Sequence, residues 1–515
     1  MSTAPPRPLR SLRWCDVYSE AELYRSALRV YTKPLFQWRK ALSTSTDGAT
    51  LYDFASRGLR NLESLHRSLR RREFIFRPAV ALHYNFNGKH RTLYIAPWEE
   101  RIVDLLLYRV LNQRLHDWFS PGAYAYRDHG YGLDPCQARI AALLRASSSP
   151  LYLVKRDIAD YFASVNHEIL LAQLRTLVDP ADYLFRLLEE RIRFLYEEEG
   201  EPMRAAVGIP FGTAAACLFA NIYLSGLDRE MESLPRLHWF RYADDLLAVS
   251  ASRETAVQAA RKLESVLATL QLRLKPSHSA DLMVTSAAHV VDIRTGLAEP
   301  PPAGTSADVP NAAEPEAAAA PAADAAADTA FAPARGFRHL GLQFSAGGGV
   351  ALSRDKLRKV RNLFRFAFRR ARRRWKKLPD ARAQARALVA IVTETIERGV
   401  RNVAVLDYYL KHVDDEQQLA QLDRWLAEEI LSSVFGGHRK GHFRRIGFQE
   451  LRAMGLPSLL HRRRLLRRGE IQSAFFIWQR EKTTRAFRGT VARPTRPQGE
   501  AAFSSFPEAA ANPRP

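Results

Sequence analysis

The sequence predicts an α+β fold, and three observations carry this prediction. Residues 79–95 and 238–250 alternate apolar and polar side chains on either side of a tight turn, which is typical of antiparallel strands. Residues 98–118 and 253–272 repeat apolar side chains every three or four positions, which is typical of amphipathic helices. The chain has 515 residues, of which 46% are hydrophobic, so we expect several cores and more than one structural unit.

The charge balance indicates a polyanionic partner. The sequence has 77 Lys and Arg against 55 Asp and Glu, which gives a formal net charge of +22. Nucleic acid is the first candidate for such a surplus, and the plainer alternative is an arginine-rich proteome. The positive charge clusters in places, which favours nucleic acid.

The cysteines and the apolar runs bear on location. Cys15, Cys136 and Cys217 form no CxxC pair, which excludes a zinc ribbon and a disulfide framework and fits a reducing cytosol. The first residues lack the apolar core of a signal peptide, and no apolar run is long enough to span a membrane. We therefore expect a cytoplasmic protein with no membrane partner.

The first predicted hairpin follows a basic helical region at 1–75. Asn87 and Gly88 separate two alternating runs, and Asn-Gly is the strongest short hairpin signal because both residues tolerate a positive φ. Pro97 then precedes the helix predicted at 98–118.

The second hairpin carries the most informative side chains. Asp244 and Asp245 are adjacent in "YADD", and Asp157 ends the strand-like run "LYLVKRD". Carboxylates this close repel each other, whereas a divalent cation between them makes the arrangement favourable. Three carboxylates on two strands can hold two metal ions, which suits phosphoryl transfer. The alternative for "YADD" taken alone is a solvated turn.

The second half of the chain changes composition twice. Residues 296–335 have almost no large apolar side chains and cannot offset the entropy of ordering, so we expect a disordered insertion. Residues 336–345 return to a strand pattern. Beyond 350 the chain is helical and very basic, and residues 365–377 interleave cations with aromatics. Such a helix can pack on a core and face phosphates, although a solvated face is the alternative.

The order of these motifs resembles the palm of reverse transcriptases. "DIADYF", "GIPFGTAAACLFANIYL", "YADD", "LRLKPSHS" and "FRHLGLQF" follow one another in the family's order. The upstream "RTLYIAPWEERIVDLLLYRVL" and "FSPGAYAYRDHGYG" resemble the fingers motifs of prokaryotic members, the relatives of group II intron, retron and diversity-generating retroelement enzymes. The resemblance covers roughly 75–350 and implies a right-hand polymerase with fingers, a palm with an antiparallel sheet, and a helical thumb.

The domain division that we expect combines this resemblance with the composition. It consists of an N-terminal helical extension (1–75), fingers (76–150), a palm with the catalytic hairpin (151–295), the disordered insertion (296–335), primer-grip strands (336–350), a helical thumb (351–430), a helical basic C-terminal extension (431–490) and a disordered tail (491–515).

The resemblance implies a metal site built on the three aspartates. Asp157 resembles the first metal-binding aspartate of the family, and Asp244 and Asp245 resemble the pair on the hairpin. Ile158 resembles the position whose backbone carbonyl also reaches a metal. The implied cofactors are two Mg²⁺ ions, with Mn²⁺ as an alternative.

Five residues are implied at the incoming nucleotide. Arg91 and Arg101 fall where cations of the fingers meet the triphosphate, although Arg101 could equally be a solvated helix residue. Phe162 stands where the family has its steric gate, a ring that excludes the ribose 2′-OH, and core packing is the alternative. Asn221 matches an asparagine near the incoming sugar, with local hydrogen bonding as the alternative. Gly212 belongs to a turn that lets the backbone approach the template and incoming base.

Further residues are implied along the template and primer. They are Arg127, Gly208, Pro210, Phe211, Leu340, Gly341, Arg369 and Arg373. Gly208 and Pro210 share the turn of Gly212. Arg127 matches an arginine with a structural or template-contacting role. Leu340 and Gly341 resemble the primer grip, and the last two arginines lie in the basic thumb helix.

Three departures from the family pattern lie near the template and nucleotide. The middle residue of Pro-x-Gly is commonly glutamine and is Phe211 here, and the usual Ser-Pro or Ser-Gln is replaced by Ala216-Cys217. A family lysine thought to protonate the leaving pyrophosphate is replaced by His278. Imidazolium can also act as a general acid, so we expect chemistry that titrates nearer neutral pH. The alternative is that Lys275, or no residue, takes this role.

The resemblance implies an RNA-directed DNA polymerase that joins dNTPs to a primer 3′-OH on an RNA template. No endonuclease signature is evident, and the altered motifs and basic C-terminal extension resemble the unknown-group and antiviral defence enzymes of bacteria. A dedicated non-coding RNA or partner protein is a further candidate partner. Two alternatives stay open: a catalytically altered, maturase-like RNA-binding scaffold, and a polymerase without a conventional template.

Overall fold

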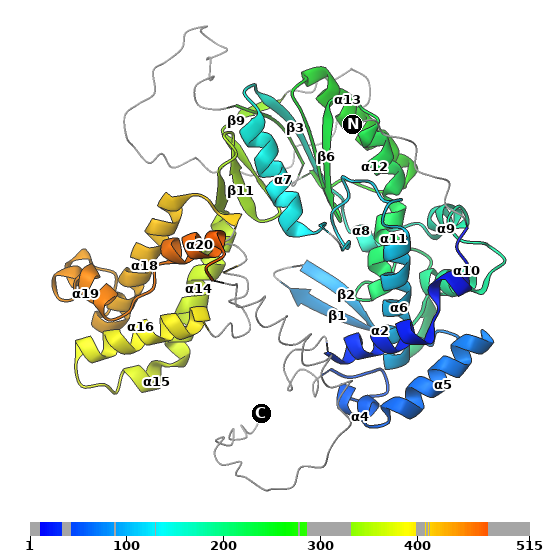
Figure 1. The fold of residues 1–515 in the computed structure, drawn as a ribbon, viewed down its shortest axis with the longest axis horizontal. Coiled ribbons are helices and arrows are strands. Elements are labelled where there is room, and N and C mark those ends of the chain that lie inside the picture. Colours follow the sequence, from blue (N-terminus) through cyan, green and yellow to red (C-terminus); the bar gives the residue numbers. More distant parts are fainter. Residues whose placement is uncertain are drawn as a thin grey trace.

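A computed structural model describes residues 11–32, 43–86, 89–128, 130–276, 279–285, 331–397, 407, 410 and 412–471. Helices and strands are mixed throughout, which confirms the predicted α+β class. Figure 1 shows the helices from α14 to α20 gathered in a group of their own, away from α2, α4 and α5 of the N-terminal part.

The central element is a five-stranded sheet with the order β6-β7-β3-β8-β9. Its strands are β3 (Leu151–Asp157), β6 (Leu237–Tyr242), β7 (Asp245–Ser250), β8 (Ala280–Val284) and β9 (Ala332–Ala334). The first four are paired antiparallel, and β8 and β9 are paired parallel. The predicted hairpin at 238–250 and the predicted strand ending at Asp157 are therefore confirmed, and they are neighbours in one sheet.

The strand β9 corrects the boundary of the predicted insertion. We expected residues 296–335 to be disordered, but Ala332, Pro333 and Ala334 pair with Leu282, Met283 and Val284. Small residues can extend a sheet edge through backbone hydrogen bonds alone, so composition is a poor guide here. Residues 286–330 lie outside the described part of the chain.

Two hydrophobic cores lie on opposite faces of the five-stranded sheet. Because side chains alternate along a strand, Val154, Leu246 and Ala248 join one core while Leu153 and Leu247 join the other. Helices that contribute to the first core include α6 (Trp98–Arg114), α9 (His167–Arg175), α10 (Tyr183–Ile192), α11 (Ala214–Tyr223), α12 (Ser225–Glu232) and α13 (Arg253–Thr269). The second core contains α7 (Leu133–Ala146) and the helices that follow residue 350.

The first predicted hairpin forms a second sheet, with the order β2-β1-β4-β5. Its strands are β1 (Ala79–Phe86), β2 (Lys89–Ile95), β4 (Leu195–Glu198) and β5 (Glu201–Arg204). Phe86 pairs with Lys89, which confirms strands on either side of Asn87-Gly88. The pair β4-β5 comes from the range assigned to the palm, so the sheet of the expected fingers is built from more than residues 76–150.

The N-terminal region is helical, as predicted. Its helices are α1 (Trp14–Val17), α2 (Glu20–Thr32), α4 (Leu51–Ser56) and α5 (Gly58–Arg71). The helix α2 packs along α6, which ends at Arg114 rather than at the predicted residue 118. Leu115 is the C-cap of α6 and lies buried in the first core.

A three-stranded sheet and a helical bundle complete the described chain. The sheet consists of β10 (Gly336–His339), β11 (Leu342–Ser345) and β12 (Val350–Leu352). The helices are α14 (Arg354–Arg370), α15 (Arg372–Trp375), α16 (Ala381–Glu397), α18 (Glu416–Phe435), α19 (Phe448–Ala453) and α20 (Leu459–Arg468), with a 3-10 turn η3 (Lys440–Arg444). The basic helix predicted at 365–377 is interrupted at Ala371, so it spans the end of α14 and the short α15.

Within the described ranges, no helix is both long enough and apolar enough to cross a bilayer. None of the three cysteines, all of which lie in the described part of the chain, is in a disulfide: Cys15 is exposed, Cys136 buried and Cys217 half-buried.

Candidate active site

The turn of the β6-β7 hairpin places its two aspartates at one end of the strands of the sheet. Tyr242 pairs with Asp245, so Ala243 and Asp244 form a two-residue turn. Ala243 has a φ of 58°, in the left-handed region that a tight hairpin turn requires. Asp244 therefore lies in the turn itself, and Asp245 begins β7.

Asp157 lies directly opposite Asp245. The two residues are partners in the antiparallel pairing of β3 with β7, which brings their Cα atoms to about 4.5–5.5 Å. The Ile158 amide donates to the carbonyl of Asp244 over 3.3 Å, and the Lys275 amide donates to the carbonyl of Asp157 over 2.8 Å. Backbone hydrogen bonds thus hold the three predicted aspartate ligands, and Ile158, at the same end of strands β3 and β7.

A lysine accompanies the carboxylates on the same face of the sheet. Residues 153, 155 and 157 of β3 point to one side, and so do residues 245 and 247 of β7. Burial lowers the pKa of Lys155, while the charges of Asp245 and Asp157 act in the opposite direction. Lys155 therefore supplies a nearby positive charge, which the sequence analysis missed. The alternation in "LYLVKRD" is the signal that could have found it.

The donor chemistry and the backbone positions fit a divalent cation, because carboxylate oxygens are the ligands that Mg²⁺ prefers. Within the described part of the chain, however, no three His, Cys, Asp or Glu side chains are gathered as a group that could hold a metal ion. Carboxylates repel one another without a cation between them, so binding requires these side chains to turn toward a shared centre.

A buried ion pair anchors the β6-β7 hairpin. Arg241 is fully buried and donates to both carboxylate oxygens of Asp228 over 2.7 Å, and Trp239 donates to the same carboxylate over 2.9 Å. The backbone of Arg241 also bonds to Gly122 and Tyr124. Neither Arg241 nor Asp228 was predicted as a site residue, since only their position in space distinguishes them from other charged residues.

Asn221 belongs to this buried network. Its amide donates to the carbonyl of Ala125 over 2.8 Å, and its side-chain oxygen accepts from Arg241 over 3.1 Å. The side chain is fully buried. The local bonding considered above is therefore present, and a contact with the incoming sugar stays a prediction that would require a change of this network.

An aromatic cluster lies beside the aspartate turn. Phe162 is in the short helix α8 (Tyr161–Ser164), and its ring contacts the rings of Tyr126, Tyr161 and Phe211 at centroid distances of 6.4, 5.7 and 5.3 Å. Burial raises the pKa of Tyr126, and Cys217 and then Asp244 add smaller effects in the same direction, so this cluster borders the carboxylates.

The predicted glycine turn is bonded to the same segment. The amides of Gly208 and Ile209 donate to the carbonyls of Val165 and Phe162, both over 2.8 Å. A Cβ atom at Gly208 would lie 3.0–3.1 Å from the backbone of Phe162 and Ala163, and its φ is 86°. Gly208 is therefore required by close packing against α8. Pro210 follows as a buried residue and Gly212, with a φ of 101°, is exposed.

The predicted arginines differ in what they contact. Arg101 stacks on Trp98 at 4.2 Å and donates to the carbonyls of Ala96 and Thr44 over 2.7 and 2.8 Å. Arg127 is buried and donates to three backbone carbonyls, those of His116, Ser120 and Ala123. The structural role considered for Arg127 is the one this geometry supports, and a triphosphate contact by Arg101 stays a prediction. Arg91 belongs to β2, but its side chain lies outside the described residues, as does His278.

The predicted primer-grip residues form a tight turn. His339 pairs with Leu342, so Leu340 and Gly341 connect β10 to β11, and both have a positive φ. The carbonyl of Leu340 accepts from Gln137 of α7 over 3.1 Å. In the expected thumb, Arg369 and Arg373 are exposed. Their contacts with nucleic acid stay predictions.

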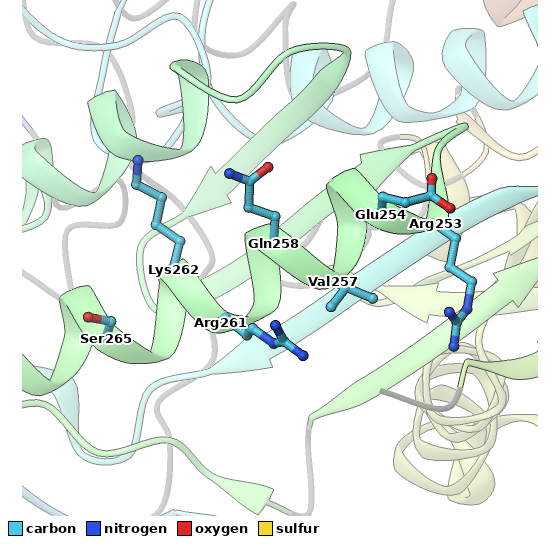
Figure 2. Close-up of a pocket in the computed structure, with 7 residues that line it drawn as sticks. All are labelled: Arg253, Glu254, Val257, Gln258, Arg261, Lys262 and Ser265. Carbon is cyan, nitrogen blue, oxygen red and sulfur yellow. The ribbon is translucent and has the colours of Figure 1, made fainter. Parts of the chain in front are cut away.

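A shallow hollow of about 700 Å³ lies elsewhere, along α13. Its lining residues all belong to that one helix and are Arg253, Glu254, Val257, Gln258, Arg261, Lys262 and Ser265 (Figure 2). None of them was predicted as a site residue, so we do not assign the chemistry to this hollow.

Comparison with known proteins decides the family. The family described as "Reverse transcriptase (RNA-dependent DNA polymerase)" matches residues 85–343, about half of the chain. This chain belongs to the reverse transcriptase family. The matched range contains Asp157, Asp244 and Asp245, and the α+β architecture described above is that of a right-hand polymerase.

Two similar proteins illustrate how far the likeness extends. An "Uncharacterized 91 kDa protein in cob intron" of Schizosaccharomyces pombe is 24% identical over 174 residues, which are 34% of this chain. This reverse transcriptase spans only 21% of that relative's length. Among solved structures, an apo telomerase from Candida tropicalis truncated from its C-terminal domain aligns with a TM-score of 0.37 and 10% identity. That alignment covers 60% of this chain and 63% of the telomerase chain.

Proposed function

We propose that this reverse transcriptase extends a DNA primer on an RNA template, with two divalent metal ions held by Asp157, Asp244 and Asp245. One observation carries the proposal. Asp157 and Asp245 are cross-strand partners, and Asp244 lies in the adjoining turn, so three acids from two separate parts of the chain meet at one end of the β3 and β7 strands. A solvated turn would explain Asp244 and Asp245 but not the facing aspartate.

The proposed residues act mainly by position. Asp157 and Asp245 are fixed by strand pairing, and Asp244 by the turn. Bound there, two Mg²⁺ or Mn²⁺ ions would lower the pKa of the primer 3′-hydroxyl and neutralise charge on the triphosphate. Lys155 offsets part of the negative charge that the three carboxylates leave when no cation is bound.

The first experiment measures primer extension on a primed RNA template with dNTPs and Mg²⁺. We expect Asp245→Asn to reduce the rate roughly a thousandfold or more, since metal ions supply several kcal/mol of transition-state stabilisation. The matched control is Glu254→Gln, an exposed carboxylate on α13, which should leave the rate unchanged.

Metal binding provides a second readout that is independent of activity. Titration with Mn²⁺, followed by electron paramagnetic resonance, should show binding to the wild type and weaker binding to Asp245→Asn. Mn²⁺ binding without extension would instead favour the RNA-binding scaffold. That alternative is supported by the departures at Phe211 and Ala216-Cys217.

We also propose that His278 protonates the leaving pyrophosphate in place of the family lysine. The imidazole must be protonated to act as the acid, so the extension rate should fall as pH rises through about 6–7. His278→Lys should move this fall to a higher pH. A wild-type rate that stays constant from pH 6 to 8 would exclude the role.

The proposed biological setting is a domesticated or antiviral defence reverse transcriptase in the bacterial cytoplasm. Support comes from the departures at Phe211 and His278 and from the basic region that follows the thumb. A dedicated non-coding RNA would then serve as template. Sequencing the RNA that co-purifies with the protein should yield one dominant species, whereas a broad mixture of cellular RNA would argue against this setting.

A further inference from the structure

Phe211 stands where the family commonly has glutamine, and the structure shows what the replacement contacts. Its ring meets the ring of Phe162 edge to face, with the centroids 5.3 Å apart and the planes at 79°. Both side chains are half-buried, so each keeps an accessible surface beside the aspartate turn. A glutamine at this position would offer no ring edge to Phe162.

Backbone hydrogen bonds hold the Phe162–Phe211 pair in place. The carbonyl of Phe211 accepts from the amide of Tyr94 in β2 over 3.2 Å. Two residues earlier, the amide of Ile209 donates to the carbonyl of Phe162 over 2.8 Å. The turn that carries Phe211 is thus fixed both to the sheet of the fingers and to Phe162 itself.

Two further aromatic side chains contact Phe162. Tyr126 meets it at 87° and Tyr161 at 70°, both edge to face. Phe211 is the member of this set that comes from the glycine turn, so it limits movement of the Phe162 ring toward that side. A half-buried ring without this contact would have more rotational freedom.

We propose that Phe211 is a specificity-determining residue, which holds the Phe162 ring in place and thereby strengthens discrimination against ribonucleotides. The inference rests on the proposed function, because it requires Phe162 to lie at the sugar of the incoming nucleotide. A steric gate rejects the 2′-OH only if its ring cannot move aside. The residue that limits its movement therefore affects selectivity without contacting the sugar.

The experiment compares single-nucleotide insertion of dATP and of ATP opposite the same template base. The measured quantity is the ratio of kcat/KM for dATP to kcat/KM for ATP. An edge-to-face pair stabilises enough for Phe211→Ala to lower this ratio by about two- to tenfold. Phe211→Gln, which restores the common family residue, should lower it similarly. Leu59→Ala, which removes an exposed apolar side chain of α5, should leave it unchanged.

A double-mutant cycle separates buttressing from a direct contact. Phe162→Ala should lower the ratio more than Phe211→Ala does, and adding Phe211→Ala to it should have no further effect. Melting temperatures check folding, and Phe211→Leu, which keeps an apolar side chain without the ring edge, replaces Phe211→Ala if the latter does not fold.

The possible outcomes test the role of Phe211 separately from the proposed polymerase function. Normal dATP insertion by Phe211→Ala with an unchanged ratio overturns the inference and leaves the polymerase intact. An unchanged ratio in Phe162→Ala removes the gate, and the inference with it. No insertion of dATP by the wild type would overturn both the proposed function and the role of Phe211.

Discussion

Single buried side chains carry pH dependence that is unrelated to the chemistry. Glu100 in α6 has no exposed surface, and one of its carboxylate oxygens accepts from the backbone amide of Arg77 over 2.7 Å. The other oxygen has no hydrogen-bond partner among the described residues. Burial raises the pKa of Glu100 to about 7, against the opposing effect of Arg77 and Arg191.

This shift predicts a stability that falls as pH rises. A carboxyl whose folded pKa is above its unfolded value near 4.5 contributes fully below pH 4.5, and the contribution is lost as pH rises through about 7. We expect the wild type to lose at most about 3 kcal/mol relative to Glu100→Gln between pH 5 and 8. Chemical denaturation of both proteins across this range measures it, and parallel pH profiles would contradict the prediction.

A second residue-scale prediction concerns a buried histidine beside the β10-β11 turn, the predicted primer grip. His339 is 1% exposed, and neither ring nitrogen has a hydrogen-bond partner within the described chain. Burial, with a smaller effect of Lys155, lowers the pKa of His339 to about 3, so it is neutral at ordinary pH. Replacing an unpartnered buried polar group by an apolar one of similar shape is neutral or stabilising.

We therefore expect His339→Phe to raise stability by about 1 kcal/mol, if the ring fits without strain. The matched control is His167→Phe. His167 is 3% exposed, but its Nε2 pairs with the carbonyl of Gly208 at 2.6 Å. That substitution leaves a carbonyl unpaired and should lower the melting temperature. Thermal unfolding of the two variants should thus change in opposite directions, and a lower melting temperature for His339→Phe would refute the argument.

At the scale of the element, α14 presents a face suited to a phosphate backbone. Val360, Phe364 and Phe368 are buried, whereas Lys359, Arg369 and Arg370 are exposed. Arg365 differs from these because Glu429 accepts from it at 3.0 Å through both carboxylate oxygens. The exposed cations are therefore the ones available to nucleic acid.

Reversal of charge on this face and on the adjoining α15 should weaken duplex binding in a salt-dependent way. For Arg369→Glu combined with Arg373→Glu, we expect the slope of log affinity against log salt to become shallower by roughly 1 to 2, since each phosphate contact contributes about 0.9. Fluorescence anisotropy with a labelled RNA–DNA duplex measures the slope. Arg424→Glu, an exposed arginine of α18, is the control and should change it little.

The same scale shows what the sequence could predict. Strand alternation and the family's order of motifs were enough to predict that Asp157, on one strand, and Asp244 and Asp245, on another, belong to one site, because the strand signals are local and the motif order resembles the family's. The parallel pairing of β1 with β4 joins residues more than a hundred positions apart, and no local pattern marks it. The buried Arg241–Asp228 pair was missed for a related reason. A charged residue shows its burial only through the elements packed around it.

At the scale of the whole molecule, the insertion divides one sheet. Strands β8 and β9 flank residues 286–330, and they run parallel, with Leu282 opposite Ala332 and Val284 opposite Ala334. Two adjacent parallel strands cannot be joined by a tight hairpin turn, because the chain must return to the starting end of the first strand. The return here is short. It covers two residues at about 3.3 Å each and one strand spacing of about 4.8 Å.

The length of this connection predicts different effects for two deletions, of 296–330 and of 286–330, although composition alone predicts the same effect for both. Deletion of 296–330 keeps about twelve residues, 285–295 and Phe331, between the strands, which is the length that a parallel crossover needs, so the melting temperature and primer extension should match the wild type. Deletion of 286–330 leaves only Thr285 and Phe331 between the strands. The β8–β9 pairing and the contact of Phe331 with Tyr152 at 5.3 Å should then be lost, with a lower melting temperature. Equal melting temperatures for the two deletions would show that β9 contributes nothing to the stability of the sheet. A lowered melting temperature in the shorter deletion would instead mean that residues 296–330 themselves stabilise the polymerase.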